Sequence, residues 1–205
     1  NGVVYNEMKG AFSSADGVLD REILRSLFPD TPYSNESGGD PQVIPELTYE
    51  EYLNFHRQYY HPSNSYIYLY GDMDVVEKLN WLDQEYLSHY DKIEVDSSIP
   101  EQKPFDAPKE HEIPYSISST DSTENNTYLS CNWAVGTNLD RELYIAFDIL
   151  DYALLSTQGA PVKQALLDAG IGTDIYGGYD SSSYQPIFSI VAKHANASEQ
   201  KRFEQ

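Results

Sequence analysis

The sequence is poor in cysteine and in basic residues, and it contains no long hydrophobic run. Cys131 is the only cysteine among 205 residues, so the chain can form no internal disulfide and no cysteine-based zinc cluster. Only 13 lysines and arginines stand against 33 aspartates and glutamates, which gives a formal net charge of -20. Nucleic acid and anionic membrane surfaces are therefore disfavoured as partners, because both bind through cationic side chains. No apolar run approaches the roughly 20 residues that a membrane-spanning helix needs.

The familiar catalytic motifs are also missing from the sequence. The five histidines include no pair four residues apart, and neither H-E-x-x-H nor H-x-x-E-H occurs. No G-x-S-x-G elbow, P-loop or G-x-G-x-x-G is present. His56 lies on the apolar stripe of an expected helix, which favours a core or boundary residue, and His61 precedes Pro62 at a helix end, which favours a cap. Neither pattern indicates a metal ligand.

What is present is a mixture of helix and strand signals. Thr48 and Glu51 form a capping box at the start of one expected helix, and Asp74 is placed to cap another. Period-2 alternation of apolar residues predicts half-buried strands in the second half of the chain. Helices are expected over residues 3–12, 22–28, 48–61, 74–87, 139–155 and 161–170, with a further one beginning near 197, and strands over 66–70, 111–117, 129–135, 173–179 and 184–193. The pattern favours an α+β fold with a mixed or antiparallel sheet packed against helices.

Glu7 is unusual because of its position in the first expected helix. Helical spacing puts it on the same side as Val3, Val4, Met8 and Ala11. A carboxylate on a buried apolar face must be paired, protonated or metal-bound. The pattern alone favours a buried ion pair or a contact at the helix end, and it leaves a metal ligand open.

The segment GVVYNEMKGA at residues 2–11 resembles one found in the presequence-protease branch of the pitrilysin/insulinase family of zinc peptidases. Further stretches agree in the same order: SGGDP at 37–41, IPELT at 44–48, YHPSN at 60–64 and GIGTD at 170–174. In that family two histidines of an H-x-x-E-H motif and a distal glutamate bind Zn²⁺, and the glutamate of the motif is the general base. The resemblance assigns the role of distal zinc ligand to Glu7.

The resemblance also implies a domain organisation. The family repeats a related α+β domain along one polypeptide, arranged around a closed chamber that admits unstructured peptides. Residues 1–94 would be the C-terminal part of the first domain, 95–108 a proline-rich linker, and 109–205 the N-terminal part of the second. We therefore expect an internal fragment of a zinc metalloendopeptidase, inactive alone, with Zn²⁺ absent or weakly bound because the H-x-x-E-H motif lies outside it. Its expected partners are peptide substrates, including cationic ones, and the remaining domains of the same polypeptide.

Two other hypotheses stay open at this point. The parent protein is alternatively a catalytically inactive homologue that binds peptides or assists assembly, or the chain is an α+β domain with only an architectural likeness. The single cysteine suits a cytoplasmic protein, or an organellar matrix in a eukaryote.

Overall fold

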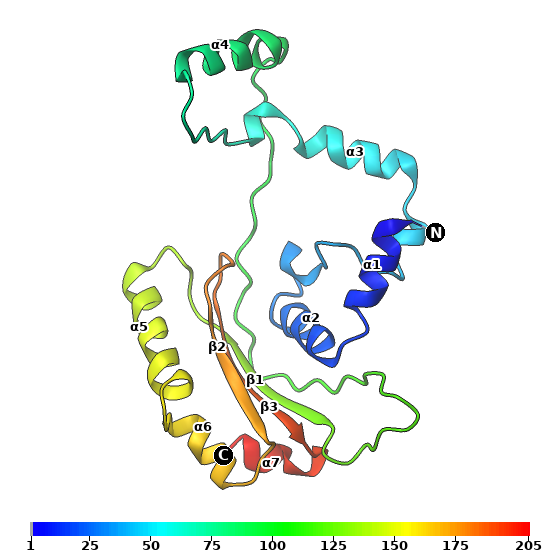
Figure 1. The fold of residues 1–205 in the computed structure, drawn as a ribbon, viewed down its shortest axis with the longest axis vertical. Helices are drawn as coiled ribbons and strands as arrows, with labels where there is room; N and C mark the ends of the chain where they lie inside the picture. Colours follow the sequence, from blue (N-terminus) through cyan, green and yellow to red (C-terminus); the bar gives the residue numbers. More distant parts are fainter. Residues whose placement is uncertain (1) are drawn as a thin grey trace. The chain divides into compact units, whose positions relative to one another are not determined.

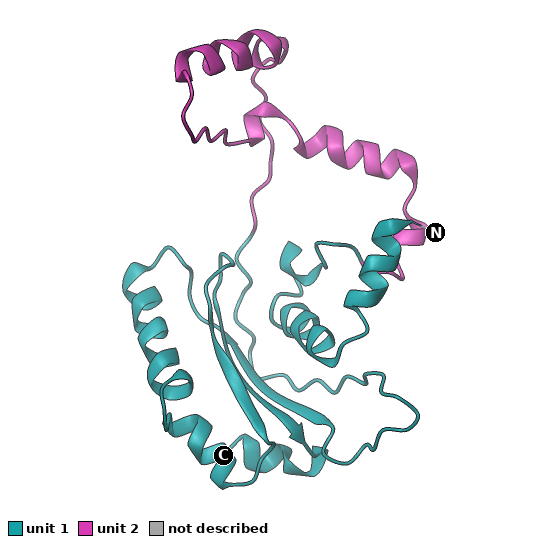
Figure 2. Ribbon diagram, viewed as in Figure 1, with its two compact units in different colours: residues 1–39, 100–205 teal, residues 40–99 magenta. Residues whose placement is uncertain are grey.

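The computed structural model describes residues 2–205, and they divide into two compact units (Figure 2). The larger unit combines the residues up to Gly39 with Pro100–Gln205, and the smaller unit is Asp40–Ile99. The larger unit holds the sheet and the core, whereas the smaller unit is built of helices and extended chain. The α+β class is confirmed.

The sheet of the larger unit has three antiparallel strands in the order β1-β3-β2. They are β1 (Thr127–Ala134), β2 (Asp174–Asp180) and β3 (Ile187–Ala195). β2 and β3 form a hairpin, and β1 pairs with the other side of β3. Because side chains alternate between faces, the register puts Leu129, Ile175 and Ala192 on one face and Tyr176 and Val191 on the other.

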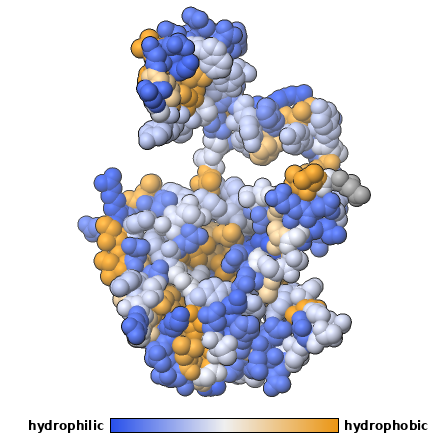
Figure 3. Space-filling view, in the orientation of Figure 1, coloured by the Kyte–Doolittle hydropathy of each residue, from blue (hydrophilic) through white to orange (hydrophobic). Residues whose placement is uncertain are grey.

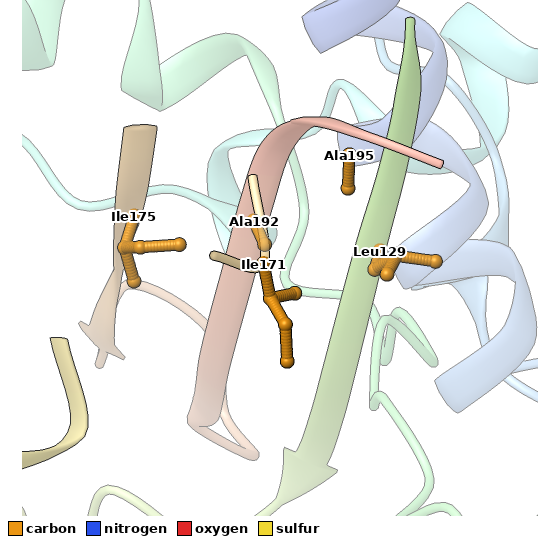
Figure 4. Close-up of a cluster of buried hydrophobic side chains, with 5 residues drawn as sticks. All are labelled: Leu129, Ile171, Ile175, Ala192 and Ala195. Atoms are coloured by element: carbon orange, nitrogen blue, oxygen red, sulfur yellow. The ribbon is translucent and has the colours of Figure 1, made fainter. Parts of the chain in front are cut away.

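Helices lie on both faces of this sheet (Figure 1). On the face of Ala192 lie α5 (Arg141–Asp151), a π-helical turn (Tyr152–Ser156), α6 (Pro161–Asp168) and α7 (Gln200–Phe203). Phe147 of α5 packs on Phe188 of β3, with ring centroids 5.8 Å apart. The opposite face meets α2 (Ala15–Leu27), which follows α1 (Val3–Ala11) in the chain. The buried core cluster lies on the α5–α6 side and consists of Leu129, Ile171, Ile175, Ala192 and Ala195 (Figure 4).

The proline-rich segment predicted as a linker is anchored to the larger unit through Gln102, which is buried. The Gln102 backbone N–H donates to the side-chain oxygen of Gln185 (2.6 Å), whose amide donates back to the Gln102 carbonyl (3.2 Å). The Gln102 side chain accepts from the backbone N–H of Asp30 (2.9 Å) and donates to the Asp30 carboxylate (2.8 Å). Residues 95–108 form no helix or strand. The domain boundaries on either side of them stay a prediction.

The smaller unit contains α3 (Tyr49–Tyr59), α4 (Val75–Glu85) and short 3-10 turns at Ile44–Glu46, Pro62–Asn64 and Leu87–His89. The predicted capping box is present: the Thr48 hydroxyl accepts from the Glu51 N–H (3.2 Å), and the Glu51 carboxylate accepts from the Thr48 N–H (2.8 Å). Yet no residue of this unit is buried. Figure 3 shows hydrophobic residues on its surface. Several aromatic side chains of this unit are also exposed, among them Tyr52, Phe55 and Trp81.

Two predicted strands are wrong. Residues 66–70 and 111–117 are extended in part but form no strand, and no backbone hydrogen bond is made by either stretch. A strand is stabilised by pairing with another strand, and alternation of side chains alone does not supply one. Tyr68 and Tyr70 still stack with nearly parallel rings, 6.4 Å apart, as neighbours on one face of an extended chain do. Helix α2 also begins seven residues earlier than predicted, because Ser14 caps it through the Gly17 N–H.

Candidate functional site

Glu7 lies in the middle of α1, and its side chain is exposed. Val3, Val4 and Ala11 are three or four residues away and therefore share its side of the helix. All three are exposed, Val3 to 83% and Val4 to 56%. The prediction that this face is buried is wrong within residues 2–205. Met8 does not belong to it, since successive residues are about 100° apart around a helix.

The opposite side of α1 is the one that packs. Tyr5, Met8 and Phe12 are half-buried and follow one another at helical spacing. Lys9 lies over the Tyr5 ring, 5.7 Å from its centroid. The Met8 side chain packs directly against Gly38, since a Cβ added to Gly38 would lie 2.8 Å from the Met8 Cε. Helix α1 thus attaches by one side and presents Glu7 on the other.

The structure does not bring a complete metal site together around Glu7. Among residues 2–205 there is no group of three His, Cys, Asp or Glu side chains placed to hold a metal ion. Neither a hydrogen bond nor an ion pair joins the Glu7 carboxylate to another residue in this range, so the alternative of a buried ion pair has no support here. An exposed carboxylate without a partner is a suitable oxygen donor, and it fits the role of one ligand to Zn²⁺. The assignment of Glu7 stays a prediction.

Histidines have structural roles in the smaller unit. His61 caps the turn at Pro62–Asn64, its Nδ1 accepting from the Ser63 N–H (3.1 Å). The predicted cap therefore belongs to this turn and not to the end of α3, whose C-cap is Tyr60. His56 is exposed and stacks on Tyr60 with ring centroids 4.7 Å apart. Neither imidazole lies in a cluster of metal-binding side chains.

A polar cluster that the sequence did not reveal joins α2 to the sheet. Lys193 of β3 forms an ion pair with Asp16 of α2 (3.0 Å), and the Tyr176 hydroxyl donates to the same carboxylate (3.3 Å). The Lys193 ammonium also lies over the rings of Tyr128 and Tyr176, at 5.2 and 5.8 Å. These residues are up to 177 positions apart in the chain, and the only local signal was the alternation that puts Lys193 and Tyr176 on one face.

The protonation states of these residues suit a structural role and not catalysis. The hydrogen bond to Asp16 raises the pKa of Lys193, and burial followed by the nearby Asp16 charge raises the pKa of Tyr176. Lys193 therefore stays protonated and Tyr176 stays neutral at physiological pH. A protonated amine and a neutral phenol are poor general bases, so the cluster is a structural link between α2 and the strands.

No helix within residues 2–205 is both long and apolar enough to cross a bilayer.

Comparison with known proteins places the chain in a family. Residues 46–205 match the family model described as the peptidase M16 inactive domain. The chain is 46% identical over 203 residues to protein HypA of Clostridium perfringens, covering 99% of this chain and 21% of that protein. It is 38% identical over 196 residues to presequence protease 1, chloroplastic/mitochondrial, of Arabidopsis thaliana, covering 94% and 18%. The chain thus spans about a fifth of the length of these curated relatives.

Solved structures agree with this fold. A protease from Helicobacter pylori superposes with a TM-score of 0.60 at 15% identity, covering 98% of this chain and 49% of that one. A peptidase M16 inactive domain from Pseudomonas fluorescens superposes with a TM-score of 0.61 at 18% identity, covering 98% and 48%. At such identities the structures establish the fold alone, whereas the matched sequence establishes the family. The chain belongs to the peptidase M16 family, and its resemblance to the presequence-protease branch is confirmed.

Proposed function

We propose that this chain is part of a zinc-dependent metalloendopeptidase that degrades short, unstructured peptides in a closed chamber, and that Glu7 is its distal metal ligand. The observation that carries the proposal is the exposed, unpaired Glu7 carboxylate within a segment whose relatives are named presequence proteases. In such an enzyme bound Zn²⁺ would polarise the scissile carbonyl and lower the pKa of a water molecule. Glu7 contributes one carboxylate oxygen, held on a regular helix.

The chain is inactive alone under this proposal. A catalytic zinc ion takes three protein ligands and keeps a fourth position open for water. Glu7 is one candidate ligand, and residues 2–205 contain no cluster that would complete the set. The exposed Val3, Val4 and Ala11 around Glu7 are suited to contact with another part of the parent protein, which would bring the missing ligands and exclude bulk water from the carboxylate.

The remaining domains of the same polypeptide are the proposed partner of the smaller unit. Many of its large hydrophobic side chains are exposed, and none of its residues is buried. Extensive exposed apolar surface is typical of an interface. Peptide substrates, including cationic ones, are attracted by the net charge of -20, and nucleic acid and membrane surfaces are not. We place the parent protein in the cytoplasm, or in an organellar matrix if it is eukaryotic.

The alternative function is a catalytically inactive homologue that binds peptides or assists assembly. The matched family model, the peptidase M16 inactive domain, fits this alternative as well, because the match begins at residue 46 and does not include Glu7.

The parent protein with Glu7→Gln tests the ligand. The amide keeps the size and polarity of the side chain but is a much weaker zinc ligand, so zinc content in a buffered zinc solution and peptide hydrolysis should both fall. The thermal unfolding midpoint of the zinc-free protein should be kept. Glu85→Gln, at an exposed position of α4, is the matched control and should change neither. Unchanged zinc content in Glu7→Gln would show the ligand assignment to be wrong. A wild-type parent that binds peptides without cleaving them would favour the inactive homologue.

A further inference from the structure

We infer that Gly38 and Arg21 are positioning residues for Glu7: they fix the rotation of α1 and so direct the Glu7 carboxylate away from the larger unit. The inference rests on the proposed role of Glu7 as a zinc ligand. It concerns contacts inside the larger unit only, since residues up to Gly39 belong to it.

The first contact is the packing of the Met8 side chain against Gly38. Gly38 lies in a turn closed by a hydrogen bond from the Gly39 N–H to the Glu36 carbonyl (3.0 Å), and Gly39 has a φ of 93°. A Cβ at Gly38 would lie 2.8 Å from the Met8 Cε and closer still to the sulfur. The Met8 side chain therefore occupies the space that any larger residue at position 38 would take. Met8 packs on this turn from the side of α1 that faces away from Glu7, so the contact helps to fix which side of the helix faces the larger unit.

The second contact holds the C-terminal end of α1. The Arg21 guanidinium of α2 lies over the Phe12 ring, 3.6 Å from its centroid, and its Nη1 donates to the Ala11 carbonyl (3.2 Å). That carbonyl is one of the last in the helix and has no partner within it. The Ser13 hydroxyl satisfies the Gly10 carbonyl in the same way (2.6 Å).

Two contacts separated along the helix axis determine its rotation. Met8 and Phe12 lie on the packed side, and Glu7 lies with Val3 and Ala11 on the exposed side. Since neighbouring residues are about 100° apart, even a partial roll of α1 would carry the carboxylate sideways by more than a metal–ligand bond tolerates. Within residues 2–205 no hydrogen bond or ion pair holds the Glu7 side chain, so its direction follows from the orientation of α1. Residues that orient a ligand in this way typically change metal affinity about 10- to 100-fold when replaced.

The test uses the parent protein with Gly38→Val, with Gly10→Ala as the matched control. A Cβ at Gly10 meets nothing within 4 Å, so this control adds bulk to α1 without touching either contact. Zinc affinity is measured by competition with a chelator, and the visible absorption of the Co²⁺-substituted protein reports the ligand geometry directly. We expect Gly38→Val to weaken zinc binding about 10- to 100-fold and to alter the Co²⁺ spectrum, with the far-UV circular dichroism retained. Gly10→Ala should match the wild type in zinc affinity, Co²⁺ spectrum and far-UV circular dichroism, and its unfolding midpoint should be equal or slightly higher, because Ala favours a helix over Gly.

A double-mutant cycle separates positioning from a general loss of stability. Met8→Ala and Gly38→Val act on the same contact, so the double variant should lose no more affinity than the larger of the two single effects. If Gly38→Val does not fold, Arg21→Met decides, because it removes the guanidinium contacts and keeps the length of the side chain. Wild-type affinity and an unchanged Co²⁺ spectrum in Gly38→Val or in Arg21→Met, alongside a loss in Glu7→Gln, would overturn the positioning role alone. Unchanged zinc binding in Glu7→Gln as well would instead overturn the proposed function.

Discussion

Gln102→Ala tests whether the side chain of Gln102 holds the proline-rich segment to Asp30 in the larger unit. The substitution removes three hydrogen bonds: one accepted from the Asp30 N–H, one donated to the Asp30 carboxylate, and a long one (3.4 Å) donated to the Lys103 carbonyl. A bond between neutral groups contributes about 0.5–1.5 kcal/mol, and one to a charged group about 1.5–3 kcal/mol. Asp30 is exposed, so water replaces part of the lost interaction. We expect a loss of about 1.5–3 kcal/mol in the free energy of local opening.

Hydrogen–deuterium exchange at the Asp30 amide is the direct measurement, because that N–H is itself the donor. At 1.4 kcal/mol per factor of ten, its exchange should become about 10- to 140-fold faster. Exchange in peptides from β1 should stay unchanged, since the bonds between β1 and β3 do not involve Gln102. Gln84→Ala, at an exposed site in α4, is the control and should leave the Asp30 amide unaffected.

Gln102→Glu distinguishes the two hydrogen bonds between the Gln102 side chain and Asp30. The variant keeps an oxygen to accept from the Asp30 N–H but puts a second carboxylate against that of Asp30, where the distance is now 2.8 Å. At neutral pH exchange should accelerate, because like charges repel, and lowering the pH should reverse part of the effect. If the Asp30 amide exchanged equally fast in the wild type and in Gln102→Ala, the anchoring argument would be refuted.

Two further predictions concern the sheet. Gly177→Ala should weaken the pairing of β2 with β3 by about 2–4 kcal/mol. The reason is that Gly177 has a φ of 147° and a new Cβ would lie 2.8 Å from the Ser189 carbonyl carbon. Wild-type protection of the β3 amides against hydrogen exchange in this variant would contradict the prediction. Stability should fall as the pH rises above about 10, because folding raises the pKa of both Lys193 and Tyr176, and the stabilisation is complete only below their unfolded values. Tyr176→Phe should reduce this alkaline slope in urea unfolding at pH 8–12, and an equal slope in both proteins would count against the cluster.

Elements with local start signals were predictable from the sequence. The Thr48 capping box marks the start of α3, Asp74 caps α4, and Pro161 begins α6. The alternation in β1 and β3 was also sufficient, since both strands find partners in the larger unit. Residues 66–70 show an equally strong strand pattern but have no partner in residues 2–205. Strand formation depends on chain that is distant in sequence, and no local pattern contains that information.

The site was predictable only through resemblance. Spacing put Glu7 beside Val3 and Val4 correctly, but it could not show that the face they share is exposed. Which side of a helix packs is decided by the contacts it meets, here Gly38 for Met8 and Arg21 for Phe12. The cluster of Lys193, Tyr176 and Asp16 could not be predicted from the sequence, because it joins two distant parts of the chain.

The unpaired stretch at residues 66–70 has a consequence for how the protein can be produced. YIYLY is rich in β-forming residues, carries no charge and contains no proline, which is the composition of segments that stack into cross-β fibrils. Asp72 and Asp74 follow it closely, and charges in that position oppose stacking between identical chains. During synthesis this stretch emerges from the ribosome well before the sheet of the larger unit is complete. Recombinant production of the 205 residues by themselves therefore favours low temperature, low protein concentration and low salt, under which the acidic flank is least screened.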